Sequence, residues 1–231
     1  GLRLWLDANN INGDATADTL ADGSVITQWI DQSGNTNNAG QGTANAKPTY
    51  AASALNNMGV VRFTVAQSLD ITSSNDFSTV IAVMNQASSQ SAETKPLGSN
   101  IFATTSAGKF GMKRQGSAWM DSGISSHSPA LITMQLHPGN YALYVNGINK
   151  GTGTDPVAPT SATKVGNDFA GDIAELIAYN TALSEGVRHK VEGYLAHKWG
   201  LAGSLPPTHT YKVGKPAFGG AQVLTFQPLS D

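Results

Sequence analysis

The feature that most constrains this chain is a change of hydrophobic period late in the sequence. Residues 171–179 alternate between two faces, which is the period of two that a β-strand imposes. Residues 184–199 then place apolar side chains on one face of a helix, namely Val187, Val191, Tyr194, Leu195 and Trp199. Ser184 suits the N-cap of this helix and Gly200 suits its C-terminal end. We therefore expect one amphipathic helix that lies against the rest of the chain.

Upstream of this helix the chain is typical of an all-β protein. Short apolar or alternating runs, separated by turn-forming Gly, Asn and Asp, occupy residues 2–7, 60–65, 80–84, 130–136 and 141–147. Strands that recur at intervals of about 8 to 15 residues predict an antiparallel β-sandwich. Three of the four tryptophans are expected in the core or where the helix docks: Trp5, Trp29 and Trp199.

Composition excludes several classes of partner. The 231 residues include no cysteine, so neither disulfides nor thiolate metal sites can form. Only 13% of the residues are charged and the net charge is −2, which gives no electrostatic basis for binding nucleic acid or an anionic membrane. No run approaches the ~18 apolar residues of a membrane span, so we expect no membrane insertion.

Several motifs resemble one known family. The strand "GDIAELIAYNTALS" at 171–184 is similar to the last core strand of concanavalin A-like and laminin G-like jelly rolls. The segment "VEGYLAHKWGLAGSLPPTHTYK" at 191–212 is similar to the helical tail of a laminin G-like subfamily common in large exported bacterial proteins. Four earlier segments match the same subfamily: "LRLWLDA" at 2–8, "VITQWIDQSGNTNNAGQ" at 25–41, "KPTY" at 47–50 and "YALYVNG" at 141–147.

This resemblance implies an architecture and a location. It predicts an all-β, antiparallel two-sheet jelly-roll sandwich at residues 1–213, with one C-terminal amphipathic helix at 184–199. Residues 214–231 resemble a linker followed by the start of an immunoglobulin-like module, and the alternative is an extra edge strand. The chain is then expected at the bacterial cell surface, extracellular, beside immunoglobulin-like repeats of the same protein.

Catalytic patterns are absent from the sequence. Retaining glucanases of this fold carry carboxylates at i, i+2 and i+4 of one strand, about 5 to 5.5 Å apart where they react. None of the four glutamates has such a partner, since Asp172 and Glu175 fall on opposite faces of a strand. We therefore expect that the protein is not an enzyme, although an inverting carboxylate pair from separate loops remains an alternative.

The sequence favours calcium over zinc as a bound metal. No H-x-x-x-H pair occurs, and exposure or contact with a helix C-terminus is the ordinary explanation for His189, His197 and His209, so a zinc site is not expected. Calcium (Ca²⁺) is the more plausible cofactor, because it takes several oxygen ligands from loops. One candidate loop holds Asp7, Asn9, Asn10, Asp14 and Asp18, and the other joins Asp121, Asn167 and Asp168.

A sugar site requires an aromatic face and planar polar groups. The candidate ligand-binding residues, if their loops share one rim of the sandwich, are Trp119, Asp121, Asn140, Tyr141, Asn167 and Asp168. The alternative is that Trp119 covers a sheet edge and that Tyr141 is an ordinary cross-strand packing residue.

The resemblance favours a non-catalytic carbohydrate-binding and adhesion module whose partner is a glycan or cell-surface polysaccharide. A structural spacer or self-association domain without a glycan ligand is the alternative. A polysaccharide hydrolase is a third reading.

Overall fold

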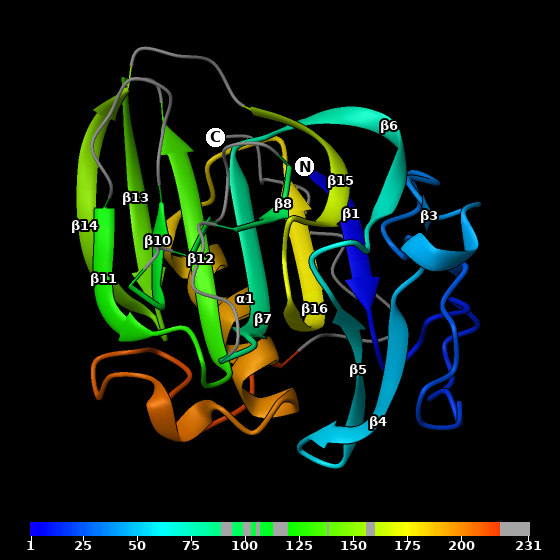
Figure 1. Cartoon of the computed structure of the whole chain (residues 1–231). Helices are drawn as coiled ribbons and strands as arrows, with labels where there is room; N and C mark the ends of the chain where they lie inside the picture. Colours follow the sequence, from blue (N-terminus) through cyan, green and yellow to red (C-terminus); the bar gives the residue numbers. More distant parts are fainter. Residues whose placement is uncertain are drawn as a thin grey trace.

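The computed structural model describes residues 1–88, 94–98, 103–104, 107–112, 120–137, 139–155 and 160–217. This part of the chain contains three antiparallel sheets and one α-helix, which confirms the predicted all-β class (Figure 1). Two smaller sheets lie on one face of the largest sheet, and the helix lies behind its other face (Figure 1). The predicted module at 214–231 lies almost entirely outside the described residues.

The largest sheet has eight strands in the order β14-β13-β12-β7-β16-β5-β4, with β1 also paired to β16. Its strands have these bounds: β1 Leu2–Asp7, β4 Thr49–Leu55, β5 Met58–Phe63, β7 Thr79–Gln86, β12 Ala130–His137, β13 Gly139–Val145, β14 Ile148–Asp155 and β16 Gly171–Tyr179.

The two smaller sheets complete the sandwich. One has the order β2-β3-β6-β15-β8 and the other the order β11-β10-β9. Their strands have these bounds: β2 Gln28–Trp29, β3 Ala39–Gly40, β6 Leu69–Phe77, β8 Lys95–Leu97, β9 Ala103–Thr104, β10 Lys109–Met112, β11 Met120–Ser125 and β15 Thr160–Asn167. Two short 3₁₀ turns, η1 Ala44–Ala46 and η2 Ala202–Ser204, lie in connections.

Strand β16 is the centre of the large sheet. It pairs with β7 along one edge, and it shares its other edge between β5, at Gly171–Ile173, and β1, at Glu175–Tyr179. The seven consecutive residues from Ile173 to Tyr179 are all buried, because both faces of the strand are covered. A strand buried on both faces has no solvent-facing side, so a charged residue within it must find partners inside the protein.

The helix forms where the change of period predicts it. Helix α1 spans Glu185–Lys198, with Ser184 at the N-cap position and Trp199 at the C-cap position. Gly200 follows with φ of +75°, a left-handed conformation that glycine adopts without steric strain. Trp5, Trp29 and Trp199 are all buried, as expected.

The helix differs from the expected pattern in which residues it buries. Val191, Leu195 and Trp199 are fully buried, but so are the charged residues Arg188 and Glu192. Strand β1 differs in a similar way, since both of its faces are covered rather than one. Periodicity assigns charged residues to solvent, and it therefore misses charges that are paired inside the protein.

Glu175 on β16 holds the helix against the sheet. Its carboxylate is completely buried and accepts four side-chain hydrogen bonds. Oε1 accepts from Trp5 Nε1 at 2.7 Å and from the Tyr194 hydroxyl at 3.0 Å. Oε2 accepts from Lys198 Nζ at 2.7 Å and from Trp199 Nε1 at 2.8 Å. One carboxylate thus joins β1, β16 and the second half of α1.

Lys198 links a second carboxylate to this group. Its Nζ donates to Asp7 Oδ2 at 2.5 Å as well as to Glu175. Burial by itself lowers the pKa of Lys198, but the two carboxylates outweigh burial and raise that pKa above its ordinary value. Burial and the charge of Asp7 raise the pKa of Glu175, and Lys198 opposes that rise.

Replacing Glu175 with Gln tests this buried group. The variant keeps the side-chain size but removes the charge and one acceptor, which leaves Lys198 and an indole N–H poorly paired. We expect a loss of about 3 kcal/mol in the free energy of unfolding, measured by urea denaturation.

Asp172→Asn is the matched control on the same strand. Asp172 pairs with Arg62 at 2.7 Å, and the Arg62 side chain is 52% exposed. The control is expected to lose less than about 1 kcal/mol. Equal losses in the two variants would show that the buried group is no more important than an exposed ion pair.

Candidate functional site

A polar cleft lies between the first half of α1 and the outer strands of the large sheet. Its volume is about 570 Å³, within the range of sites that hold small ligands. The cleft is lined by side chains from strands β12 to β14, from α1 and from the segment after the helix: Gln135, His137, Tyr144, Gly147, Asn149, Leu183, Ser184, Glu185, Arg188, His189, Pro206, Thr208 and His209. Three separate parts of the chain therefore build one concave surface.

Exposed polar groups form the rim of the cleft. His137 lies at the end of β12, Asn149 at the start of β14 and Glu185 at the start of α1, and all three are exposed. The Asn149 Oδ1 atom accepts a hydrogen bond from the Gly151 amide at 2.8 Å, which fixes the side chain in place. An amide, a carboxylate and an imidazole thus face solvent around one opening.

Arg188, His189 and His209 form the floor of the cleft, and Glu192 lies beneath them, bonded to Arg188 and beside His209. Glu192 is completely buried, and its Oε1 accepts from the Thr133 hydroxyl at 2.7 Å. Its Oε2 accepts from Arg188 Nη1 at 2.8 Å and contacts His209 Nε2 at 3.2 Å. His209 has only 3% of its surface exposed. The carboxylate is therefore compensated by groups from the sheet, the helix and the segment after the helix.

Arg188 is held on three sides. Its guanidinium carbon lies 3.9 Å from the centroid of the Tyr144 ring, and its Nη2 lies 3.9 Å from the exposed carboxylate of Glu185. A guanidinium over an aromatic face is stabilised by the ring quadrupole. The stacking fixes Arg188 against the sheet and Glu192 at the same time.

His189 is positioned at the edge of the floor. Its Nε2 lies 3.3 Å from Arg188 Nη2, and its Nδ1 lies 3.0 Å from the Thr210 hydroxyl. Because arginine only donates, Nε2 must accept, and the ring proton belongs on Nδ1. Burial, the neighbouring His209 and the charge of Arg188 all lower the pKa of His189. The ring is therefore neutral at neutral pH.

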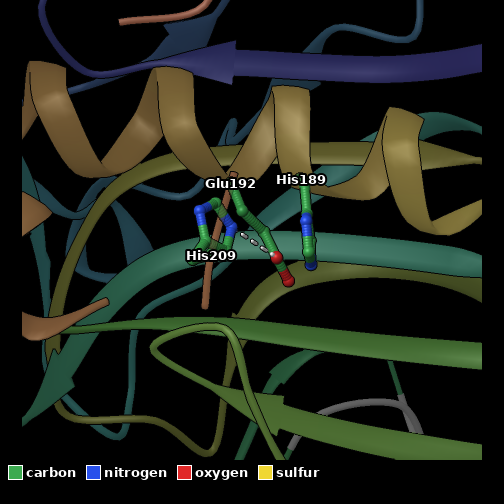
Figure 2. Close-up of side chains that lie close together, drawn as sticks. All are labelled: His189, Glu192 and His209. Carbon is green, nitrogen blue, oxygen red and sulfur yellow. Dashed lines mark hydrogen bonds and ion pairs between the residues drawn. The ribbon is translucent and has the colours of Figure 1, made fainter. Parts of the chain in front are cut away.

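Three of these side chains converge on one point, as Figure 2 shows: His189, Glu192 and His209. One potential ligand atom from each lies within 4.8 Å of the others. The expectation of exposure or of contact with a helix C-terminus is wrong for His209, which is buried and lies beside Glu192 of α1. A signal was present in the sequence, since His189 and Glu192 are three residues apart and share a helical face.

The predicted sugar site is only partly described. Trp119 lies outside the described residues. Asp121 on β11 is exposed, and its carboxylate accepts from the Gly123 amide at 2.7 Å. Asn140 on β13 is exposed, whereas Tyr141 is 4% exposed. A Cβ added at Gly153 would lie 2.3 Å from the Tyr141 ring, so this ring packs across the neighbouring strand.

The remaining two residues of that prediction lie in another sheet. Asn167 ends β15 in the five-stranded sheet, and Asp168 follows it with φ of +51°. The Asn167 amide donates to Asp168 Oδ2 at 3.1 Å. In Figure 1, β15 lies right of the centre beside β6, whereas β11 and β13 lie at the left. The structure therefore groups Asn167 with Asp168, away from the strands that carry Asp121, Asn140 and Tyr141.

The carboxylates of the first predicted calcium loop have partners in the protein. Asp7 binds Lys198 and the Asn9 amide, while Asp18 accepts from the Ile11 amide. Asp14 accepts from Thr16, whose hydroxyl and amide lower the pKa of this carboxyl. The Asn10 amide donates to Gln32 at 3.0 Å. The calcium prediction itself stays a prediction.

Comparisons with known proteins give likeness at the level of fold. No protein-family model matches the chain, and no curated protein sequence matches it. The chain superposes on Trypanosoma rangeli sialidase in complex with sialic acid with a TM-score of 0.52 and 13% identity, over 86% of this chain and 33% of the sialidase. It thus spans about a third of that enzyme.

Two further solved structures are similar. Domain 4 of AbnA, a GH43 extracellular arabinanase from Geobacillus stearothermophilus in complex with arabinotriose, has a TM-score of 0.48 and 17% identity, over 71% of this chain and 96% of that domain. A GH54 α-L-arabinofuranosidase has a TM-score of 0.48 and 15% identity, over 83% of this chain and 58% of that one.

The sialidase match corrects one expectation and leaves another without support. It contradicts the prediction that the protein is not an enzyme, because the matched chain is itself an enzyme. That prediction depended on carboxylate spacing along one strand, a criterion that misses groups brought together from separate elements. The comparisons show an all-β sandwich, and they do not show a laminin G-like or concanavalin A-like family.

The described part of the chain contains no helix with the length and hydropathy of a membrane span.

Thr133→Val tests the buried hydrogen bond beneath the cleft. Valine fills the same space but leaves Glu192 Oε1 without the hydroxyl donor at 2.7 Å. We expect the free energy of unfolding to fall by about 1 to 3 kcal/mol in a chemical denaturation experiment.

Thr72→Val is the control, since the Thr72 hydroxyl donates to the Asn38 carbonyl at an exposed position. Its effect is expected to stay within about 0.5 kcal/mol. An unchanged stability of Thr133→Val would mean that Glu192 does not depend on this donor.

Proposed function

We propose that this protein binds carbohydrate, and that the ligand occupies the cleft between α1 and strands β12 to β14. The observation that carries the proposal is the cleft itself, a concave site of about 570 Å³ with hydrogen-bonding side chains from three parts of the chain. The all-β sandwich, which also occurs in a sialidase, is compatible with this function.

The chemistry of the rim suits sugar hydroxyls. A hydroxyl both donates and accepts, so it pairs well with groups that offer either role. Around the opening, Glu185 accepts, Asn149 carries both a donor and an acceptor, and His137 supplies an imidazole. Because these groups are exposed before binding, a sugar gains hydrogen bonds without breaking the buried floor.

The finer proposal is an adhesion role at the bacterial cell surface. It is supported by the similarity of residues 1–213 to laminin G-like domains of exported bacterial proteins. In this proposal the partners are a cell-surface polysaccharide and the neighbouring immunoglobulin-like repeats. The alternative, a spacer or self-association domain, makes the cleft an incidental hollow without a ligand.

A glycan array followed by titration calorimetry tests the proposal. The double variant Asn149→Ala/Glu185→Gln changes only exposed rim groups, so it is expected to fold normally and to weaken binding of any sugar hit by at least about tenfold, the loss of one or two hydrogen bonds. Trp119→Ala is the comparison variant, because it removes the aromatic residue of the site predicted from sequence.

Each outcome selects one reading. If sugar binding is lost in the double variant but kept in Trp119→Ala, the site lies in the cleft. The reverse result overturns that placement. A blank array, with concentration-dependent dimerisation, supports the spacer. Running the array with calcium and with a chelator tests the cofactor prediction, and release of reducing sugar from a bound polysaccharide would reveal turnover.

A further inference from the structure

We propose that His189, Glu192 and His209 bind a divalent transition-metal ion such as Zn²⁺ at the floor of the cleft. This site is independent of whether the cleft binds carbohydrate. Two imidazoles and a carboxylate are a ligand set that zinc uses in proteins, where a fourth position stays open to solvent or substrate. The three side chains come from two turns of α1 and from the segment that returns to it.

The spacing of the ligand atoms is close to what a metal requires. Bond lengths of 2.0 to 2.2 Å place neighbouring tetrahedral ligands about 3.4 Å apart. His209 Nε2 and Glu192 Oε2 are already 3.2 Å apart, and all three ligand atoms lie within 4.8 Å. His189 is the least buried of the three, with 12% of its side-chain surface exposed, so its ring has room for the small movement that closes the group.

His189 already has the proton arrangement of a metal ligand. Its Nδ1–H donates to the Thr210 hydroxyl, so Nε2 carries no proton; the hydrogen bond that Nε2 accepts from Arg188 at 3.3 Å is the contact that a metal ion would displace. Metal-bound histidines commonly hold their second nitrogen on such a partner, which fixes the ring orientation. Thr210 would serve as that partner.

His209 must exchange one hydrogen bond for the metal. Its Nδ1 accepts from the Tyr211 amide at 3.2 Å, so the ring proton belongs on Nε2, between the imidazole and Glu192. A metal ion at that position replaces this proton, and the ring stays a neutral imidazole by carrying its proton on Nδ1 instead. The long contact with the Tyr211 amide is given up, and a metal–nitrogen bond is gained.

Arg188 occupies the place of the cation when no metal is bound. Its guanidinium neutralises Glu192, while the exposed carboxylate of Glu185 lies 3.9 Å from Arg188 and 3.7 Å from His189 Nε2. Glu185 is 78% exposed at its side chain and free to turn inward. It can supply the fourth ligand, or it can pair with Arg188 once the metal has taken Glu192.

Titration of the full chain with Zn²⁺ near neutral pH, by calorimetry and by competition with a chromophoric chelator, tests the site. We expect one Zn²⁺ per chain and no comparable binding of Ca²⁺, which prefers oxygen ligands. His189→Asn is expected to weaken Zn²⁺ binding by at least about 100-fold, since even outer-shell partners account for 10- to 100-fold.

His197→Asn is the matched control, because His197 lies on the same helix and bonds the Tyr211 carbonyl at 2.9 Å. It should bind Zn²⁺ like the unchanged chain. Absence of Zn²⁺ binding, or equal weakening in both variants, would overturn the proposal.

Arg188→Met gives a result that a purely structural role would not produce. Removal of the competing cation should tighten Zn²⁺ binding by at least about tenfold, and Zn²⁺ should raise the melting temperature of this variant more than that of the unchanged chain. Weaker binding in Arg188→Met, with the fold intact by circular dichroism, would contradict the site.

Discussion

A carboxylate that lies in the interior must be surrounded by donors, and the structure depends on meeting this requirement at Glu175. Its four donors come from β1, from α1 and from the C-cap residue Trp199, while the residue itself lies on the central strand β16. Hydrophobic contacts allow many relative positions of helix and sheet, because they have no direction. Hydrogen bonds to one buried charge are directional, so they allow only a few relative positions of helix and sheet. The carboxylate therefore selects the position in which the helix packs.

A second buried carboxylate, Glu192, does the same at the middle of the helix. Its Oε1 accepts a hydrogen bond from Thr133 on β12, and its Oε2 lies beside His209 from the returning segment. The two carboxylates hold the middle and the C-terminal end of α1 against the sheet, so this wall of the cleft has a defined position before any ligand binds. A site whose walls are fixed in advance loses less entropy on binding a ligand than one that must be ordered.

Local sequence patterns were enough to predict the helix, which depends on hydrophobic period and capping. They were also enough to predict that Trp29 and Trp199 are core residues. They failed for Arg188, Glu192 and His209, because burial of a charged residue depends on partners that a local pattern does not contain. Glu192 and His209 are 17 positions apart, and Glu192 and Thr133 are 59 apart. The predicted rim brought residues of different sheets together for the same reason: spacing along the chain does not fix which sheet a strand joins.

The pairing of β1 with β16 has a consequence for the order in which the molecule forms. The hydrogen-bond partner of Trp5, Glu175, lies 170 positions later in the chain, and the partner of Asp7, Lys198, lies 191 positions later. Contacts between such distant residues close large loops and slow folding. During synthesis the first strand must remain unpaired, with an apolar face exposed, until β16 leaves the ribosome. The nascent chain is therefore vulnerable to aggregation in the interval between synthesis of β1 and synthesis of β16.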